Sequence, residues 1–292
     1  MQVRKIEAAF TAHIKGQWWP SRPSAPAAVG QTLCSPPTLL HDRRHMARKR
    51  STRQAPRSYS MPALSGLYGR PPFEYREAKQ MTVEFQTDPR VLRKLVPAPL
   101  TPNKDAKVFV SSAKFLSSGF GRYLEAHIFT HATFKRRLVN FSLYLVLDSD
   151  VAIGAGREIW GFPKKLGRLT LDMKDDVVST TVERGGCTLI DAAVHLAELG
   201  TEEDLGGSAE WIAHRFIPNV SLSAPPDIDQ LTSTTLTNVV THDVYKGAAT
   251  LAFGSSPADR LETIPVKQVT GGLYVDYQFT LGDGEVIHDY LA

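Results

Sequence analysis

The stretch Gly154-Ala-Gly-Arg-Glu-Ile-Trp-Gly-Phe-Pro-Lys-Lys-Leu-Gly167 places two adjacent lysines directly after a Phe-Pro turn. Trp160 and Phe162 come just before Lys164 and Lys165. Most lysine pairs are exposed to solvent, so a chemical role for one of these two lysines requires a reason for its burial. An amine becomes a nucleophile near neutral pH when burial or a neighbouring cation disfavours its charged form. The aromatic neighbours and the second cation make Lys164 a candidate nucleophile.

Outward from this stretch, the chain consists mostly of short runs with the character of strands. Met81, Val83 and Phe85 alternate with polar residues, which is the period of a half-buried strand. Asp88-Pro89 supplies an N-cap followed by proline at the first helical position, so we predict a short helix over Arg90–Val96 that stops at Pro97. Further strands are predicted at Lys107–Ser111, Arg122–Phe134, Asn140–Leu147, Arg168–Met173, Val177–Arg184, Ile190–Leu196, Leu236–Tyr245, Ala248–Phe253 and Gly272–Phe279.

Turn residues separate several of these runs: Asp175-Asp176, Gly185-Gly186 and Gly282-Asp283-Gly284. Helical pattern is sparse and no internal repeat is found. Many antiparallel strands in one domain usually close into a barrel or a sandwich. We expect a β-rich α+β domain over residues 71–292, an antiparallel β-barrel with peripheral helices that encloses an apolar pocket.

Residues 1–70 differ from this body in composition. They carry twelve Lys and Arg against two acidic residues, a net charge of +10, whereas the remaining residues sum to −6. A stretch rich in Pro, Ser, Ala and Arg cannot bury enough apolar area to offset its ordering entropy. Three interpretations compete: a disordered extension, an organelle transit peptide, and a translation start placed too early, since Met46 and Met61 precede the domain. We favour the first or the third.

Several classes of protein are disfavoured by composition. The acidic body gives no electrostatic reason to expect nucleic-acid binding, and no apolar run in the sequence approaches the length that spans a bilayer. Cys34 and Cys187 form neither a disulfide framework nor a metal-site spacing, so a cytoplasmic location is the default. His127 and His131 lie four apart on a predicted strand without a third ligand, so we expect no metal site.

The signature Gly156-Arg157-Glu158 with Gly161-Phe-Pro-Lys-Lys-Leu-Gly167 closely resembles the active-site segment of the acetoacetate decarboxylase family. Other parts of the chain are similar to landmarks of that family in the same order: Phe73-Glu-Tyr-Arg76-Glu77, Thr87-Asp88, Leu92 to Pro97, Leu147-Asp148, Ile217-Pro-Asn219, Pro265-Val-Lys267 and Val286 to Leu291. The resemblance covers effectively the whole body. This family is itself a standard example of an activated lysine.

The resemblance implies roles for particular residues. The first lysine of the family's pair forms an imine with the substrate ketone, which makes Lys164 the nucleophile and Lys165 the cation that disfavours its charged form. Glu125 matches a pocket carboxylate that assists proton transfer. Arg76 resembles the arginine near the substrate carboxylate, a task that suits a bidentate guanidinium. Glu158 is expected to hold the lysine segment through an ion pair.

The walls of the expected pocket are apolar. Trp160, Phe162 and Val146 are expected to surround the lysine. Val110 stands fifteen residues before Glu125, where the family's decarboxylases carry a second pocket glutamate. The resemblance further implies a homo-oligomer.

These expectations define a function with two alternatives. The expected function is decarboxylation of a short β-keto acid such as acetoacetate through the lysine imine, without metal or organic cofactor. Because Val110 cannot relay a proton, the first alternative is an imine-forming aldolase-dehydratase, or a related lyase, acting on a keto acid such as pyruvate. The second alternative is a non-catalytic barrel that binds a small ligand. In every case the partner is a small molecule.

Overall fold

The computed structural model describes residues 57–221 and 223–292. Twelve strands and five short helical segments follow one another in this part of the chain. The strands are β1 (Phe73–Gln86), β2 (Thr101–Pro102), β3 (Lys107–Ser117), β4 (Gly121–Phe134), β5 (Arg137–Leu147), β6 (Lys164–Leu166), β7 (Arg168–Lys174), β8 (Val177–Arg184), β9 (Cys187–Leu199), β10 (Glu210–Ile217), β11 (Ile228–Phe253) and β12 (Gln268–Asp289). The helices are α2 (Pro89–Leu95), α3 (Asp150–Ala155), the π-helical turn η1 (Gly156–Trp160), and the 3-10 turns η2 (Glu202–Leu205) and η3 (Leu261–Thr263).

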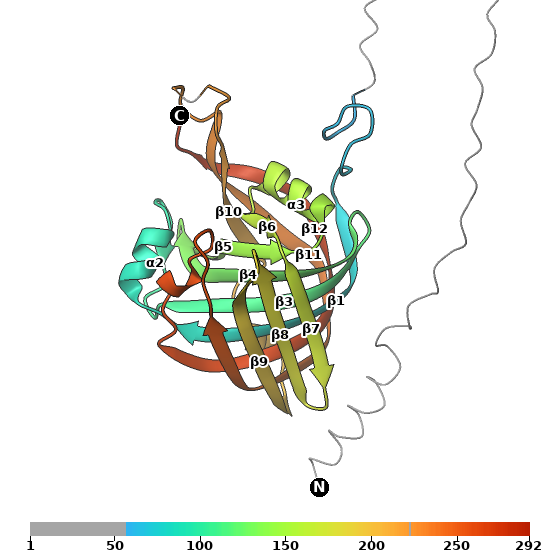
Figure 1. Ribbon diagram of the computed structural model, residues 1–292, viewed down its shortest axis with the longest axis vertical. Coiled ribbons are helices and arrows are strands. Elements are labelled where there is room, and N and C mark those ends of the chain that lie inside the picture. Colours follow the sequence, from blue (N-terminus) through green and yellow to red (C-terminus); the bar gives the residue numbers. More distant parts are fainter. Residues whose placement is uncertain (1–56, 222) are drawn as a thin grey trace, which may run out of the picture. The chain divides into compact units, whose positions relative to one another are not determined.

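All twelve strands belong to one sheet, in the order β10-β5-β4-β3-β1-β12-β11-β9-β8-β7, with β2 on β4 and β6 on β5. β10 also pairs with β11, so seven strands from β10 round to β11 form a closed circuit of hydrogen-bonded neighbours. Most pairs are antiparallel, but β5 runs parallel to β10 and to β6. Figure 1 shows α2 and α3 on the outside of these strands. The β-rich α+β class predicted from the sequence is confirmed.

Local sequence signals explain several boundaries. Asp88 caps α2, because its side chain accepts a hydrogen bond from the amide of Arg90 and Pro89 stands at the start. Gly185 and Gly186 have φ of +61° and +79° and join β8 to β9, as the predicted hairpin turn requires. The predicted boundary between Tyr245 and Ala248 was wrong, because β11 runs through it without a break.

Gly282-Asp283-Gly284 does not form the predicted turn. The three residues lie inside β12, where its register against β11 shifts between Thr234 and Leu236. The indole of Trp160 lies over this point and donates a hydrogen bond to the carbonyl of Gly282 at 3.2 Å. A Cβ on Gly284 would come within 3.0 Å of the Trp160 ring. These glycines therefore make room for a side chain instead of reversing the chain.

The end of the predicted extension that the structure describes packs on the body. Tyr68 is buried and belongs to a core cluster with Phe73, Ala155 and Trp160. Its hydroxyl donates a short hydrogen bond to Glu158 on η1. Residues 57–70 thus contact the helical segment that precedes the lysine pair, while predictions for residues 1–56, including Cys34 and Met46, lie outside the described residues. Over the described ranges, no helix is long and apolar enough to cross a bilayer.

We predict that Tyr68→Ala lowers the free energy of unfolding by roughly 3 kcal/mol, because it removes a buried aromatic ring from the core cluster. Urea denaturation of the full chain measures the change. The matched control is Leu64→Ala in the same segment, where the side chain is 98% exposed and the expected change is within about 0.5 kcal/mol. Equal effects of the two substitutions would show that the segment does not stabilise the body through Tyr68.

Candidate active site

The segment that carries the lysine pair begins as a helix and ends as a strand. Ser149 caps α3 by accepting from the amide of Ala152. The helix widens into the π turn η1 and stops at Gly161, whose φ is +76°. A Cβ at Gly161 would meet the backbone of Arg215 on β10 at 2.5 Å, so both the conformation and the close approach require glycine. Phe162 and Pro163 then lead the chain into β6.

Beside β5, the strand β6 fixes which lysine faces inward. Lys164 pairs with Leu145, and Lys165 pairs with Val146. Because successive side chains of a strand point to opposite faces, Lys164 and Lys165 leave β6 in opposite directions. The backbone carbonyl of Lys164 accepts a hydrogen bond from Arg157 at 3.2 Å, which ties β6 to η1.

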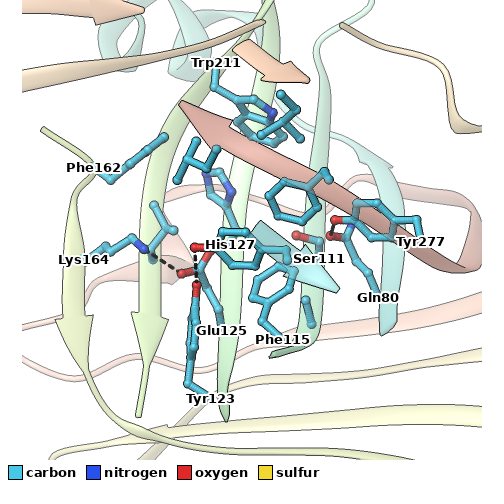
Figure 2. Close-up of a pocket in the computed structure, with 16 residues that line it drawn as sticks. Gln80, Ser111, Phe115, Tyr123, Glu125, His127, Phe162, Lys164, Trp211 and Tyr277 are labelled. Atoms are coloured by element: carbon cyan, nitrogen blue, oxygen red, sulfur yellow. Dashed lines mark hydrogen bonds and ion pairs between the residues drawn. The ribbon is translucent and has the colours of Figure 1, made fainter. Parts of the chain in front are cut away.

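Lys164 points into a cavity formed by the strands of the closed circuit. The cavity has a volume of about 80 Å³, which corresponds to roughly five to eight water-sized atoms at about 10–15 Å³ each. Figure 2 shows Lys164 and Glu125 together on one side of it, with Tyr277 and Gln80 on the other. Its lining residues are Tyr75, Gln80, Ser111, Ala113, Phe115, Tyr123, Glu125, His127, Leu145, Phe162, Lys164, Trp211, Leu236, Tyr277, Phe279 and Leu281.

A buried ion pair is the chemical centre of this cavity. The Lys164 Nζ lies 2.9 Å from Oε2 of Glu125, and the two side chains are only 9% and 13% exposed. The ammonium also lies 5.8 Å from the centroid of the Phe162 ring. A carboxylate at this distance can take a proton from the amine and return it to a reacting atom. The pair therefore brings together an amine and a carboxylate, groups that can serve as a nucleophile and an acid/base group.

The rest of the wall is uncharged. Burial raises the pKa of Tyr75, Tyr123 and Tyr277 well above the ordinary value, so all three are neutral phenols. Burial, and then the charge of Lys164, lowers the pKa of His127 to about 3, so this imidazole is neutral as well. Among the described residues that line the cavity, Lys164 is the only Lys or Arg. A bound anion therefore finds a single cation here.

Lys165 lies outside the cavity and has its own counter-ion. Its Nζ lies 2.6 Å from Oδ1 of Asp259, a carboxylate that also accepts from Arg184 and from the hydroxyl of Tyr144. Burial opposes ionisation of Asp259, but the hydrogen bonds from Lys165 and Tyr144 outweigh it and hold the pKa of Asp259 below its ordinary value. Lys165 therefore shares the Asp259 carboxylate with Arg184 on the far side of β6, and its expected influence on the Lys164 amine stays a prediction.

Arg76 also lies outside the cavity. Its side chain is 72% exposed and pairs with Glu74 at 2.8 Å. The pairing of β1 with β3 shifts register between Tyr75 and Glu77, so Arg76 is carried to the solvent face at an irregularity of the strand. Tyr75, one residue earlier, faces the cavity instead. The expected contact between Arg76 and a substrate carboxylate is therefore contradicted.

Three expected wall residues are buried behind the cavity. Val110 pairs with Ile128, whereas Ser111 pairs with His127 and lines the cavity. Val110 therefore belongs to the opposite face of β3, and its apolar side chain does not replace an acid in the cavity. Val146 is likewise on the far face of β5 from Leu145.

Trp160 is fully buried but packs against Phe73, at 6.1 Å between ring centroids, without lining the cavity. Phe162 is the expected aromatic wall residue that does line it. Glu158 accepts from the Tyr68 hydroxyl, and no ion pair of Glu158 is found among the described residues. The expected ion pair is thus replaced by a hydrogen bond to a neutral phenol.

Several lining residues were not among the site residues named from the sequence. Tyr123 and His127 follow from the alternation about Glu125, since positions two apart share a face. Gln80, Tyr277 and Trp211 come from β1, β12 and β10, and only the pairing of distant strands brings them to Lys164. Tyr277 donates a hydrogen bond to Gln80 at 2.9 Å on the side of the cavity opposite Lys164. Over residues 57–221 and 223–292, no cluster of three or more His, Cys, Asp or Glu side chains suits a metal ion.

Comparison with known proteins identifies the family of this chain. The family model described as acetoacetate decarboxylase matches residues 56–291. This chain belongs to the acetoacetate decarboxylase family. An acetoacetate decarboxylase 2 of Mesorhizobium japonicum is 29% identical over 240 residues, which is 80% of this chain and 90% of the relative. The family match starts at residue 56, so it includes the segment around Tyr68 that packs on η1.

Solved structures share the fold. The crystal structure of acetoacetate decarboxylase from Legionella pneumophila has a TM-score of 0.75 and 26% sequence identity, and the match covers 80% of this chain and 95% of that one. The enduracididine biosynthesis enzyme MppR, complexed with pyruvate, has a TM-score of 0.73 at 18% identity over 81% of this chain and all of that one. The second likeness concerns the fold alone.

We predict that Gly156→Ala displaces the Lys164 amine. The new Cβ would lie 2.5 Å from Cδ and 2.6 Å from Cε of Lys164, so the lysine chain must move away from Glu125. The rate at which the Lys164 amine reacts with a ketone should fall roughly a hundredfold, as expected for a misplacement of about 1 Å. Borohydride-dependent capture of acetone, measured by intact mass, checks this.

The matched control for Gly156→Ala is Gly154→Ala, where the new Cβ would meet only the tip of Leu67 on the outer side, at 2.6 Å. Both substitutions exchange glycine for alanine on one short helical segment. Comparable loss in the two variants would show that the effect comes from the helix and not from the lysine.

We predict that burial of His127 destabilises the fold in acid. Its pKa is about 3 in the folded protein against 6.5 for the ordinary group, so the unfolded chain binds a proton that the folded protein does not. The free energy of unfolding should therefore fall as pH drops below about 6.5, with a slope approaching 1.4 kcal/mol per pH unit from this group. His127→Gln, which keeps a hydrogen-bonding nitrogen near Ser142, should flatten the curve. The free energy of unfolding is measured by urea denaturation from pH 7 to 4.5. An equal decrease with falling pH in the two proteins would contradict the prediction.

Proposed function

We propose that this protein is a lyase that decarboxylates a β-keto acid through an imine of Lys164. The observation that carries the proposal is the buried Lys164–Glu125 pair, at 2.9 Å, in a small cavity. Relatives of the same family, in Mesorhizobium japonicum and Ralstonia nicotianae, are named acetoacetate decarboxylases. The cavity volume of about 80 Å³ suits the reacting end of a small keto acid.

The mechanism begins with transfer of a proton from the Lys164 ammonium to Glu125. The neutral amine attacks the ketone carbon, and Glu125 gives the proton back to the oxygen that leaves as water, which yields a protonated imine and the Glu125 carboxylate. The bond between the α-carbon and the carboxylate then breaks, its electron pair moves into the imine, and CO₂ leaves an enamine. A proton from solvent, delivered through Glu125, then adds to the enamine carbon. Hydrolysis of the resulting imine releases the ketone and restores Lys164, so one proton is consumed for each CO₂ formed.

The charge distribution favours loss of CO₂ over retention of the carboxylate. Once Lys164 is bonded to the ketone, the described cavity wall offers the carboxylate no Lys or Arg, and it offers the negative charge of Glu125 nearby. A carboxylate among neutral rings and phenols is poorly solvated. Cleavage to CO₂ removes that charge, and the electron pair is accepted by the cationic imine. The cavity therefore destabilises the bound acid more than the transition state.

The strand circuit supports a closed barrel as the scaffold. Seven strands, from β10 round to β11, are each hydrogen-bonded to a neighbour on both sides, and the cavity residues come from these strands, from β6 and from the loop before it. Closure holds groups from distant strands in fixed positions, which proton transfer and imine formation require. We further propose, by family membership, that the protein forms a homo-oligomer.

The aldolase-dehydratase alternative has less support in this cavity. Pyruvate keeps its carboxylate through condensation, so an aldolase needs a lasting partner for that anion. Arg76, the residue expected to serve, is at the surface with Glu74. The family likeness to MppR at 18% identity concerns the fold. A non-catalytic ligand-binding role is disfavoured by the cost of burying an amine and a carboxylate that a passive apolar site does not need.

We predict that acetoacetate with borohydride adds a covalent adduct to Lys164 and that acetoacetate alone releases CO₂. Peptide mass mapping locates the adduct, and a coupled carboxylase assay or manometry measures the gas. Lys164→Ala should abolish both signals, while Lys165→Ala should leave the adduct on Lys164, because Lys165 faces Asp259.

Glu125→Gln should reduce CO₂ release by roughly 10²- to 10⁴-fold, the range for loss of a general acid/base. Condensation of pyruvate with an aldehyde, without CO₂ from acetoacetate, would replace the decarboxylase with the aldolase. Absence of any adduct with ketones or keto acids would remove the imine mechanism.

A further inference from the structure

A second, larger chamber adjoins the lysine cavity. Its volume is about 630 Å³, against about 80 Å³ for the cavity that holds Lys164. Four residues line both spaces and form the boundary between them: Gln80, Trp211, Leu236 and Tyr277. In Figure 2, Gln80 and Tyr277 lie across the cavity from Lys164, and Trp211 lies at the top of the view. Acetoacetate needs only the small cavity, so the proposed reaction leaves the chamber without a use.

The chamber wall next to this boundary is a continuous group of rings. Trp211 lies 4.9 Å from Phe129, Phe129 stacks on Phe109 at 5.0 Å, and Phe109 lies 4.4 Å from His131, all between ring centroids. All four rings line the chamber. Their centroid separations fall in the range preferred by aromatic pairs, and a further planar ring can join such a group edge-on or offset.

The chamber has no net charge to hold an ionic ligand. Its acidic and basic residues form two ion pairs, Lys107 with Glu84 at 2.9 Å and Lys246 with Asp204 at 2.8 Å. Burial lowers the pKa of His131, so its imidazole is neutral. The occupant that suits a neutral, ring-lined space is a neutral planar group. Because Gln80, Trp211, Leu236 and Tyr277 line both spaces, a substrate that reacts at Lys164 reaches the chamber through a carbon chain that passes this boundary.

We propose that the preferred substrate is a β-keto acid whose carbon chain extends beyond the ketone, past Trp211, and ends in an aryl group in the second chamber. This proposal rests on the proposed function and specifies its substrate class. The carboxylate and ketone react at Lys164 as described above, and the aryl group contributes binding only. Uniform binding of a remote group raises kcat/KM chiefly by lowering KM.

The first test compares three acids that share the same reacting end: acetoacetate, 5-phenyl-3-oxopentanoate and 5-cyclohexyl-3-oxopentanoate. The phenyl acid should exceed acetoacetate in kcat/KM by roughly tenfold or more, through burial of the added carbons. It should also exceed the cyclohexyl acid by roughly two- to tenfold, the range of ring–ring contacts beyond area burial. Because cyclohexyl is the bulkier and more apolar group, simple hydrophobic burial gives the opposite order.

The second test fills the chamber by substitution. Thr241 on β11 lines the chamber but not the lysine cavity, so Thr241→Trp should lower kcat/KM for the phenyl acid at least about tenfold more than for acetoacetate. The control is His242→Trp on the next residue, which is exposed and should leave the ratio of the two substrates unchanged. Calorimetric binding of the product ketone, 4-phenylbutan-2-one, to both variants measures occupancy without catalysis.

The outcomes separate the two proposals. Acetoacetate turnover that equals or exceeds that of both extended acids, with no binding of the phenyl ketone, overturns the second chamber as a substrate site and leaves the decarboxylase intact. Binding of the phenyl ketone that Thr241→Trp weakens, without an adduct on Lys164 from any keto acid, supports the chamber and overturns the proposed function. A phenyl preference that survives Thr241→Trp places the aryl group elsewhere and refutes the assignment.

Discussion

Lys164 and Lys165 are neighbours in sequence but belong to opposite sides of the sheet, and the active site depends on that separation. The three residues of β6 pair in parallel with β5, which directs Lys164 into the cavity beside Glu125 and Lys165 toward Asp259. A slip of one residue in this pairing would exchange the two side chains. The loop before β6 prevents such a slip, since Gly161 lies against the backbone of Arg215 and Arg157 binds the carbonyl of Lys164.

Two carboxylates, Glu125 and Asp259, form ion pairs on opposite sides of β6. Glu125 lies inside, where the only described cation on the cavity wall is Lys164, so it is placed to move protons. Asp259 lies outside, where it pairs with two cations, Lys165 and Arg184, and accepts from Tyr144; none of these three residues lines the cavity. Asp259 thus anchors the loop before η3 to β5 and β6. Lys164 therefore has Glu125 as its ion-pair partner inside the cavity, whereas Lys165 pairs with Asp259 outside it.

The helical segment before the lysines is supported from the N-terminal side as well. Tyr68 packs into the cluster that contains Trp160 and binds Glu158, while Trp160 in turn lies on the glycines of β12. The segment is therefore held between residues 57–70 and the strand circuit. The desolvation of a buried amine is offset only if surrounding contacts fix its geometry. Residues 57–70 and the strand circuit provide such contacts for η1.

The sequence by itself determined the strand-rich class, the capped helix α2, the hairpin at Gly185-Gly186 and the identity of the lysine segment, because each depends on local pattern or turn chemistry. Glu125 could be assigned from the resemblance, and alternation about it indicated Tyr123 and His127 as neighbours on the same face. The helix α3 was not predicted, although Ser149 and Asp150 provide a cap and an acidic first turn.

Only the tertiary structure decided which side chains meet. Val110 and Ser111 differ by one position, and nothing in the local sequence says which of them faces Glu125 until β3 is registered against β4. Arg76 lies outside the site because the register of β1 shifts between Tyr75 and Glu77, and the alternating pattern does not reveal this shift. Gln80, Trp211 and Tyr277 meet because β1, β10 and β12 lie in one closed circuit. Strand register and circuit closure are pairings between residues far apart in the chain, so no local pattern encodes them.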